Sequence, residues 1–361
     1  MITRREFLSS AAAVSLVGAT RVFAETPALM SAARIGQRDG GALWRQDGFT
    51  SFDLPGRGHA MARRGASHDV MLVGRRPGTF AAIVDSSSAQ SRPRIFAPAK
   101  DCRFAGHAAF APDVSIMVTS EFDAASMQGV LVVRDAVSGE ERAHISPAGI
   151  EPHELLFAKD GSRLVVALGG LIKDGGVSAP AFNPGGIDSS VVEIDPHSGR
   201  ILMRHKLAPQ FASLSLRHLA LAPDGEHSAI AMQDQDLTQP RPLTAVLKLG
   251  GDIELLPLPA ADECDFRGYV GSIAFDISGE FIAATSPRGG VVGVWSMSTR
   301  KWLGGMALPD ACGLAAGTSP GEFWATSGYG DVVNFTATMS APIVNAKWQV
   351  AASFDNHVLR I

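Results

Sequence analysis

The sequence contains few aromatic residues, 7% of its 361 positions, with only two tyrosines and five tryptophans. Glycine is abundant at 38 residues, and this balance favours short strands joined by tight turns over long helices. Hydrophobic residues make up 46% of the chain, which is enough for a large core. A chain of this length and composition is expected to be a repetitive all-β protein.

Cysteine is scarce as well, and the three cysteines, Cys102, Cys264 and Cys312, do not form a CxxC pair. An odd number leaves at least one of them without a partner in the same chain if the compartment is oxidising. The sequence also lacks a nucleophile elbow, a phosphate-binding loop, a CxxCH haem motif and an HExxH metal motif. No motif therefore assigns a catalytic residue or a bound cofactor.

The N-terminal segment MITRREFLSSAAAVSLVGATRVFA, residues 1–24, is expected to be an export signal. Arg4 and Arg5 precede a short, mildly apolar stretch, so the segment resembles a twin-arginine (Tat) signal, with an ordinary secretory signal as the alternative. The stretch is well short of the roughly 20 apolar residues that a membrane span needs. We therefore expect a periplasmic protein in which residues 25–361 form one domain.

Charge excludes two classes of partner. Removal of residues 1–24 leaves 29 basic and 35 acidic residues, a net charge of −6. Nucleic acid and anionic membranes attract basic surfaces, so neither is an expected partner.

Internal repeats predict the fold. The segments HAAFAPD at 107, ELLFAKDG at 154, HLALAPDG at 218 and SIAFDISG at 272 share one pattern, and weaker copies begin at His59, Leu314 and His357. Each copy continues as further strands, and four strands per unit at this period are typical of a β-propeller blade. The terminal DNHVLRI would supply the innermost strand for residues 31–54, so we predict seven four-stranded blades with a closing blade shared by the two chain ends.

Seven such starts place polar residues around one mouth of the propeller channel. Four histidines and one carboxylate fall in five consecutive blades: His357, His59, His107, Glu154 and His218. His153 is one residue out of register and would join them only if a bulge reoriented it. Imidazole favours Zn, Cu, Fe or Ni, so these six residues are the candidate metal ligands.

Loops between the second and third strands of each blade reach the same face. They carry Arg75 and Arg76 and further candidate ligand-binding residues. We expect the following side chains at the mouth: Glu121, Asp123, Asn183, Arg217 and Gln233. Convergence of such groups is typical of a ligand or metal site.

A structural role for the histidines is the alternative. Propellers of the WD type often carry a Gly-His pair whose histidine bonds a turn aspartate in its own blade, and Gly58-His59 and Gly106-His107 match that pair. Two observations oppose it, because the blades lack the Trp-Asp partner and the histidines gather on one side of the ring. Glu121 and Asp123 have a similar alternative as solvated loop charges.

The segments GHAAFAPD, GIEPHELLFAKDG, LRHLALAPDG and DNHVLRI, together with the Tat-like signal, resemble the domain-of-unknown-function family 1513. The resemblance covers essentially the whole chain after the signal and implies a seven-bladed propeller similar to quinoprotein dehydrogenases. Genes of this family often lie beside imelysin-like and di-haem oxidoreductase genes linked to iron uptake. The resemblance thus implies metal handling in the periplasm, with imelysin-like proteins as partners.

Two classes of function follow. The first is a non-catalytic binding or accessory propeller in metal, above all iron, acquisition, whose histidine-rich mouth contacts a metal (Fe, Cu or Zn) or a partner. The second is a metal-dependent propeller enzyme, a lactonase-like hydrolase or a redox enzyme, in which the metal acts as a Lewis acid.

Export through the Tat pathway is tested by replacing Arg4 and Arg5 with lysine. Because the pathway recognises the arginine pair, precursor should accumulate in the cytoplasm, as fractionation and immunoblotting would show. Normal periplasmic levels of the double variant would argue for an ordinary secretory signal.

Overall fold

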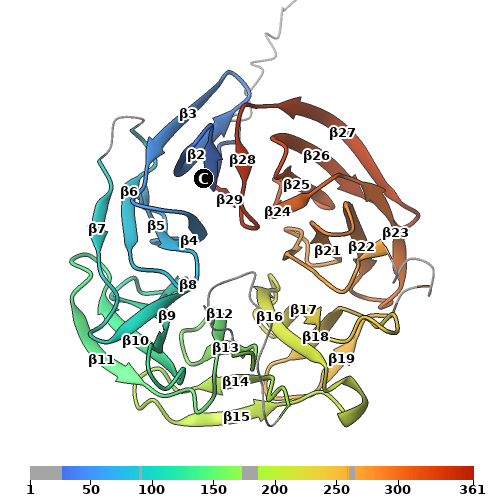
Figure 1. Cartoon of the computed structure of the whole chain (residues 1–361). Helices are drawn as coiled ribbons and strands as arrows, with labels where there is room; N and C mark the ends of the chain where they lie inside the picture. The colour runs from blue at the N-terminus through green and yellow to red at the C-terminus, as the bar shows by residue number, and fades with distance from the viewer. Residues whose placement is uncertain (1–26, 89–91, 173–185, 258, 260–264) are drawn as a thin grey trace, which may run out of the picture.

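The computed structural model describes residues 27–88, 92–172, 186–257, 259 and 265–361. Within them, 29 strands form seven antiparallel sheets around a common axis (Figure 1). One 3-10 turn (η1, Pro209–Phe211) lies between β15 and β16. The predicted seven-bladed all-β propeller is confirmed. None of the described helices is long and apolar enough to cross a membrane. The expected signal, residues 1–24, lies outside the described residues.

Six blades are continuous in sequence, and each runs from the innermost strand outward, as the following bounds show. They are β4 (Gly58–Arg63), β5 (Asp69–Gly74), β6 (Ala81–Asp85) and β7 (Arg94–Phe96) in blade 1; β8 (Cys102–Phe110), β9 (Ile116–Asp123), β10 (Gly129–Asp135) and β11 (Glu141–Ile145) in blade 2; β12 (Pro152–Phe157), β13 (Leu164–Leu168), β14 (Ser190–Ile194) and β15 (Ile201–His205) in blade 3; β16 (Leu214–Leu221), β17 (His227–Asp234), β18 (Thr244–Lys248) and β19 (Ile253–Leu255) in blade 4; β20 (Ser272–Phe275), β21 (Phe281–Ser286), β22 (Val291–Ser296) and β23 (Trp302–Ala307) in blade 5; and β24 (Ala311–Ala316), β25 (Glu322–Ser327), β26 (Asp331–Ala337) and β27 (Pro342–Gln349) in blade 6.

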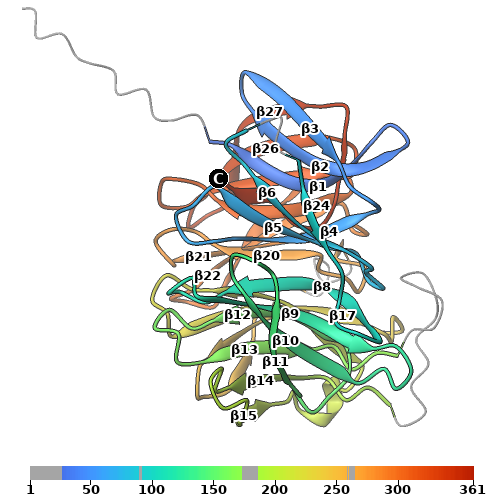
Figure 2. The ribbon, with the colours of Figure 1, turned by 90° about the vertical axis from the view of Figure 1, so that its left-hand side faces the viewer.

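The closing blade combines the two ends of the chain, as predicted. β1 (Leu29–Ile35), β2 (Arg38–Arg45) and β3 (Gly48–Asp53) come from the N-terminal end, and β28 (Ser353–Phe354) and β29 (Leu359–Arg360) both pair with β1. The side view shows the blue β1–β3 next to the red β26 and β27 (Figure 2). Closure in this way gives β1 hydrogen-bonded neighbours on both sides, so β1 is not an edge strand.

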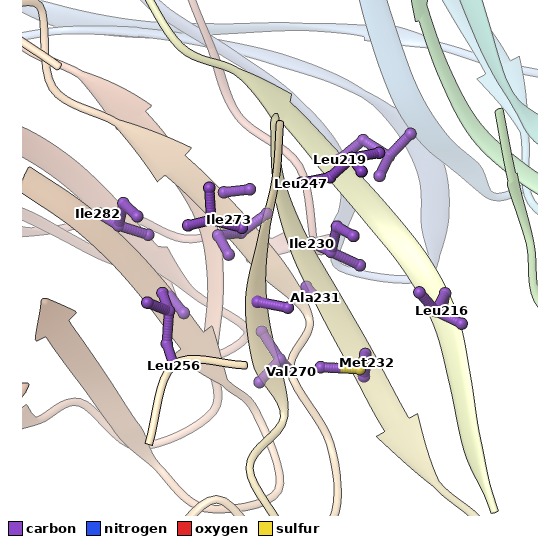
Figure 3. Packing of buried hydrophobic residues seen from close by; sticks show 14 of the residues in the cluster. Leu216, Leu219, Ile230, Ala231, Met232, Leu247, Leu256, Val270, Ile273 and Ile282 are labelled. Carbon is purple, nitrogen blue, oxygen red and sulfur yellow. The ribbon is translucent and has the colours of Figure 1, made fainter. Parts of the chain in front are cut away.

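The hydrophobic core lies between neighbouring sheets. The largest cluster among the described residues joins blades 3, 4 and 5, and it includes Met232 from β17 of blade 4 and Ile273 from β20 of blade 5 (Figure 3). The middle strands are buried on both faces, which explains apolar runs such as Ala229–Met232. Each blade therefore depends on its neighbours for burial of its own surface.

Two of the three cysteines are buried, unpaired thiols, and Cys264 lies outside the described residues. The pKa of the Cys102 thiol is raised to about 11, mainly because the thiol is buried and next because of the nearby charge of Glu121. This thiol is therefore protonated at neutral pH and unreactive.

The innermost strands share one irregularity. The register against the second strand shifts between Gly58 and Met61, Phe104 and Ala108, Pro152 and Leu155, Leu216 and His218, and Ala311 and Leu314. A bulge of this kind inserts an extra residue and redirects side chains. In blades 1, 2 and 3 the shifted segment contains a histidine from the predicted set, and in blade 4 His218 directly follows the extra residue Arg217.

Deletion of residues 359–361 tests the closure. The deletion removes the pairing of β29 with β1 and the packing of Leu359 and Ile361 against Met30 and Leu43. We expect the free energy of unfolding to fall by about 3 kcal/mol, measured by urea denaturation. Arg38→Ala at the exposed end of β2 is the control and should change it by less than about 0.5 kcal/mol. An unchanged midpoint in the truncated protein would contradict closure between the two ends.

Candidate metal centre in the propeller channel

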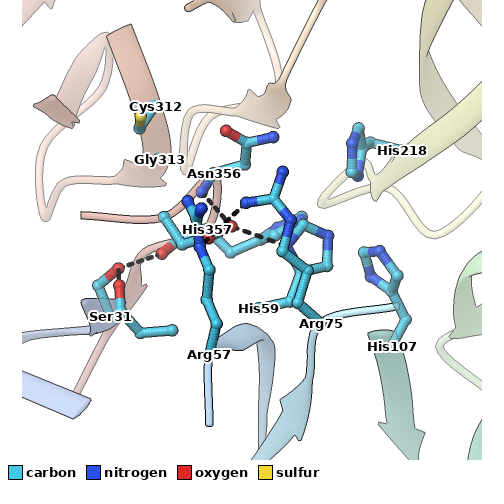
Figure 4. Close-up of polar contacts among 12 residues, drawn as sticks. Ser31, Arg57, His59, Arg75, His107, His218, Cys312, Gly313, Asn356 and His357 are labelled. Carbon is cyan, nitrogen blue, oxygen red and sulfur yellow. Dashed lines mark hydrogen bonds and ion pairs between the residues drawn. The ribbon is translucent and has the colours of Figure 1, made fainter. Parts of the chain in front are cut away.

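Five histidines from five different blades meet on the propeller axis. His59, His107, His153 and His218 lie on the innermost strands β4, β8, β12 and β16, and His357 lies between β28 and β29. Figure 4 shows four of these rings together. His107 lies at the centre of the group and is only 1% exposed. We call these five residues the histidine cluster.

The rings of the histidine cluster are close enough to share a ligand. Seven ring pairs have centroids 4.7–5.4 Å apart, and His59 lies 6.3 Å from both His153 and His218. Two triads have ligand nitrogens that all lie within 4.8 Å of one another, namely His59, His107 and His153, and His107, His218 and His357. His107 belongs to both.

Most ring nitrogens of the histidine cluster have no partner in the described part of the protein. These are both nitrogens of His107, His153 and His218 and Nε2 of His357. The aspartates of the turns that follow the innermost strands bond their own turns instead: Asp113 accepts from Ser115, and Asp160 accepts from Ser162. The hydrogen bond that would lock a turn in the same blade is therefore not made by these histidines.

Four members of the histidine cluster are neutral at physiological pH. Burial is the main reason that the pKa values of His107, His153, His218 and His357 lie well below the usual range of histidine. The neighbouring imidazoles and Arg217 lower the pKa of His107 further, because each charge would repel another. Neutral imidazoles keep a lone pair, which is the form that binds a metal.

Asp355 orients one member of the cluster. Its Oδ1 lies 2.7 Å from Nδ1 of His59, and Asp355 is fully buried. Burial alone would raise the pKa of this carboxyl, but the hydrogen bond and charge of His59 and the charges of Arg75 and Arg57 hold it well below the usual range. A carboxylate acceptor requires Nδ1 of His59 to donate, so Nε2 is the ring nitrogen of His59 that remains available to a metal. Carboxylate-bound histidines of this kind are common among metal ligands.

His153 and Glu154 both reach the site from β12. The bulge between Pro152 and Leu155 brings His153 within 4.7 Å of His107, as ring centroids measure it. Glu154 places its carboxylate oxygens 3.4 Å from Nδ1 of His218 and 3.9 Å from Nδ1 of His107. Burial raises the pKa of Glu154, although the charge of His357 opposes the effect. One strand thus contributes an imidazole and a carboxyl group.

The close approach of the His59 ring requires a glycine at position 106. Its φ of 112° lies in the region that favours glycine, and a Cβ atom there would lie 2.8 Å from Cδ2 of His59. The Gly106-His107 pair therefore serves the contact between blades 1 and 2, whereas the sequence pattern alone suggested a turn lock within one blade.

Two expected mouth residues lie beside the cluster. Arg217 Nη2 donates to Oε1 of Glu151, and its Nη1 donates to Gln233. Arg76 of blade 1 reaches the same Glu151 oxygen at 2.6 Å. Burial alone would raise the pKa of Glu151, but the two arginines lower it below its usual value.

The other expected mouth residues do not join the cluster. Glu121 is fully buried and paired with Arg134 at 2.7 Å, so it ties strands of blade 2 together. Asp123 accepts from the backbone of Ala125 and Ser126 and so caps an exposed turn. Asn183 lies outside the described residues.

Sequence reasoning missed Asp355 and Glu151, the two carboxylates that organise the site. Asp355 stands two residues before His357 in DNHVLRI, and that spacing is the only local signal for it. Its partner His59 is 296 positions away, and Glu151 is 66 positions from Arg217. Contacts at such separations follow from ring closure and cannot be deduced from a local pattern.

The fold and the site together define a seven-bladed β-propeller with a buried histidine cluster on its axis. The chain belongs to the family described as protein of unknown function (DUF1513), whose model matches residues 52–361. No curated protein matches the sequence.

Solved structures agree on the fold. Hydrazine synthase of Kuenenia stuttgartiensis is 16% identical over 83% of this chain and 90% of its own, with a TM-score of 0.61. The Cps50 (Swd1) β-propeller domain of Myceliophteria thermophila is 12% identical over 89% of this chain and 96% of its own, with a TM-score of 0.59. At these identities the likeness concerns the propeller architecture alone.

Replacement of Asp355 by asparagine tests the organisation of the site. The change leaves Arg57, Arg75 and His59 without their shared carboxylate, so the free energy of unfolding should fall by about 3 kcal/mol in chemical denaturation. The control is Asp53→Asn, which removes the exposed partner of Arg38 and should cost less than about 1 kcal/mol. Equal, small losses in both variants would show that Asp355 does not hold the mouth together.

Proposed function

We propose that this protein binds a transition-metal ion in the histidine cluster and serves in the periplasm as a non-catalytic binding or accessory propeller for metal acquisition. The observation that carries the proposal is the set of seven buried ring nitrogens that make no hydrogen bond within the described residues. Burial of a polar atom without a hydrogen bond costs about 1–3 kcal/mol, and several in one place need a shared reason. A bound metal ion supplies that reason.

The spacing of the rings suits one ion. An imidazole nitrogen binds a metal at about 2.0–2.1 Å, so its ring centroid lies about 3.2 Å from the ion. Two such rings are then about 4.5 Å apart at a right angle and about 5.2 Å apart at a tetrahedral angle. The observed 4.7–5.4 Å for seven pairs matches this range closely.

The donor set favours a metal that accepts many ligands. Imidazole suits Zn, Cu, Fe and Ni. Structural zinc takes four ligands, whereas the cluster offers five imidazoles and the carboxyl group of Glu154. Iron accommodates a higher coordination number, and the family resemblance also favours iron, with imelysin-like proteins as proposed partners.

Burial supports binding over catalysis. Catalytic metal sites keep an open position for substrate, whereas an ion in the cluster would have imidazoles on several sides and His107 deeply buried behind it. Storage, transfer or sensing of the ion needs no open position. The accessory role follows from this difference.

Titration of the purified mature protein with Fe²⁺ under anaerobic conditions, Cu²⁺ and Zn²⁺ tests the proposal. Wild type should bind one ion, and His107→Ala should lose at least about tenfold in affinity because His107 belongs to both triads. Asp355→Asn should lose about 10–100-fold through disordered His59. His205→Ala is the control, since His205 is equally buried but bonds Glu193 far from the channel.

Two outcomes would contradict the metal site. One is a wild type that binds none of the three ions. The other is a folded His107→Ala variant, checked by circular dichroism, that binds as well as His205→Ala does.

A metal-dependent propeller enzyme is the second candidate function, because of Glu154. A carboxyl group with a raised pKa beside metal ligands can accept or donate a proton in catalysis. In that case, the metal-loaded protein should hydrolyse a lactone panel or oxidise a redox dye, and Glu154→Gln should lose the turnover while it retains the metal. No turnover by the loaded wild type on these substrates favours the binding role.

A further inference from the structure

Four arginines lie at the mouth next to the histidine cluster, on the side where the innermost strands begin. Arg57 precedes β4, Arg75 and Arg76 follow β5, and Arg217 precedes His218 in β16. We call these four residues the arginine layer. In the described part of the chain, their ion pairs involve two carboxylates, Asp355 and Glu151.

The first half of the arginine layer surrounds Asp355. Nε of Arg57 and Nη1 of Arg75 donate to the same oxygen, Oδ2, at 2.8 and 2.9 Å (Figure 4). Arg57 is 48% exposed, whereas Asp355 is buried. Each guanidinium has five N–H donors, and one contact to Asp355 uses one of them. This half therefore presents donors toward solvent at the mouth.

The second half surrounds Glu151. Arg76 and Arg217 both contact Oε1, and the backbone N–H of Leu171 donates to Oε2 at 2.8 Å. The Arg217 side chain is only 8% exposed, and its Nε is a buried donor with no hydrogen-bond acceptor among the described residues. A charged donor is costly to leave unsatisfied.

The two halves of the arginine layer adjoin, because Arg75 and Arg76 are consecutive residues. The charges of Arg217 and Arg75 both act on the hydroxyl group of Tyr269, which precedes β20 and accepts a hydrogen bond from Asn356 at 2.6 Å. The charge of Arg217 also acts on His107, His153 and His218. The arginine layer therefore lies within electrostatic reach of these three members of the histidine cluster.

The arginine layer carries more charge than the carboxylates bonded to it. Within the described residues, four arginines bonded to two carboxylates leave an excess of two positive charges, which Glu154 and Asp310, an acidic group close enough to feel the charge of Arg57, offset when both are ionised. A metal cation would add to the positive charge in a buried space where Coulomb interactions are strong. An anion would oppose it and satisfy the remaining guanidinium donors.

We propose that the arginine layer is a binding site for an oxyanion, of the carboxylate or phosphate type, and that this anion enters the channel mouth together with the metal ion. Guanidinium groups match both kinds of oxyanion through paired N–H donors. The anion site stands on the arginines alone; its coupling to the metal rests on the proposed function above. If both ligands bind, each strengthens the other by the same factor, because coupling is reciprocal.

The anion site is tested on metal-free, chelator-treated protein by calorimetric titration with citrate, inorganic phosphate and acetate as separate probes. Wild type should bind citrate or phosphate saturably, and the better probe identifies the class of anion. Arg217→Gln should weaken that binding about tenfold and Arg57→Gln about threefold, because each removes charged donors.

Arg142→Gln is the matched control for Arg57→Gln. Arg142 is 49% exposed, is paired with one aspartate as Arg57 is, and lies on the outermost strand β11. Both variants remove one positive charge, so a general electrostatic effect would weaken binding equally. Arg217→Lys, which keeps the charge, covers the case in which Arg217→Gln does not fold, and it should weaken binding by loss of the paired donors.

The outcomes separate the two proposals. Absence of saturable anion binding, or equal binding by wild type, Arg57→Gln and Arg217→Lys, overturns the anion site whatever the metal titration shows. A wild type that binds the anion but no metal supports the anion site and counts against the proposed function. Metal affinity that rises with saturating anion in wild type, and rises less in Arg57→Gln, supports the coupling; an unchanged metal affinity overturns it.

Discussion

Pairing of β1 with β28 and β29 is the interaction on which the rest of the site depends. It joins residues from opposite ends of the chain and brings Asp355 and His357 against blade 1. The hydroxyl of Ser31 in β1 donates to the backbone oxygen of His357 at 2.6 Å and fixes the segment between β28 and β29. Without closure, the cluster would lose a ring, the carboxylate on His59 and the anchor of two arginines.

The bulges convert this ring of sheets into a site. A regular innermost strand would turn successive side chains to opposite faces, and His153 and Glu154 could not both approach the axis. The shift of register in β12 permits both. Similar shifts in β4, β8 and β16 lie at His59, His107 and His218, so one backbone device recurs in four blades.

The site combines a group of neutral imidazoles with an adjacent group of charged arginines. Burial keeps the imidazoles of His107, His153, His218 and His357 neutral, so these four rings can lie together without mutual repulsion. The arginines remain charged because guanidinium is protonated at any ordinary pH, and Glu151 and Asp355 neutralise only part of that charge. Neutral imidazole nitrogens, which can bind a cation, thus lie directly beside charged guanidinium groups, which can bind an anion.

The blade count, the closing blade and the blades that carry histidines were predictable, because hydrophobic alternation and turn residues repeat locally along the chain. Five of the six candidate metal ligands were deduced from the same register, and His153 was included on condition of a bulge, which the structure shows in β12. The structure brings all six side chains close together. The sequence did not predict that Glu121 pairs with Arg134, that Gly106 accommodates His59, or that Asp355 and Glu151 bind the arginines. Those contacts join blades far apart in sequence, and their geometry depends on bulges and ring closure, which only the folded chain defines.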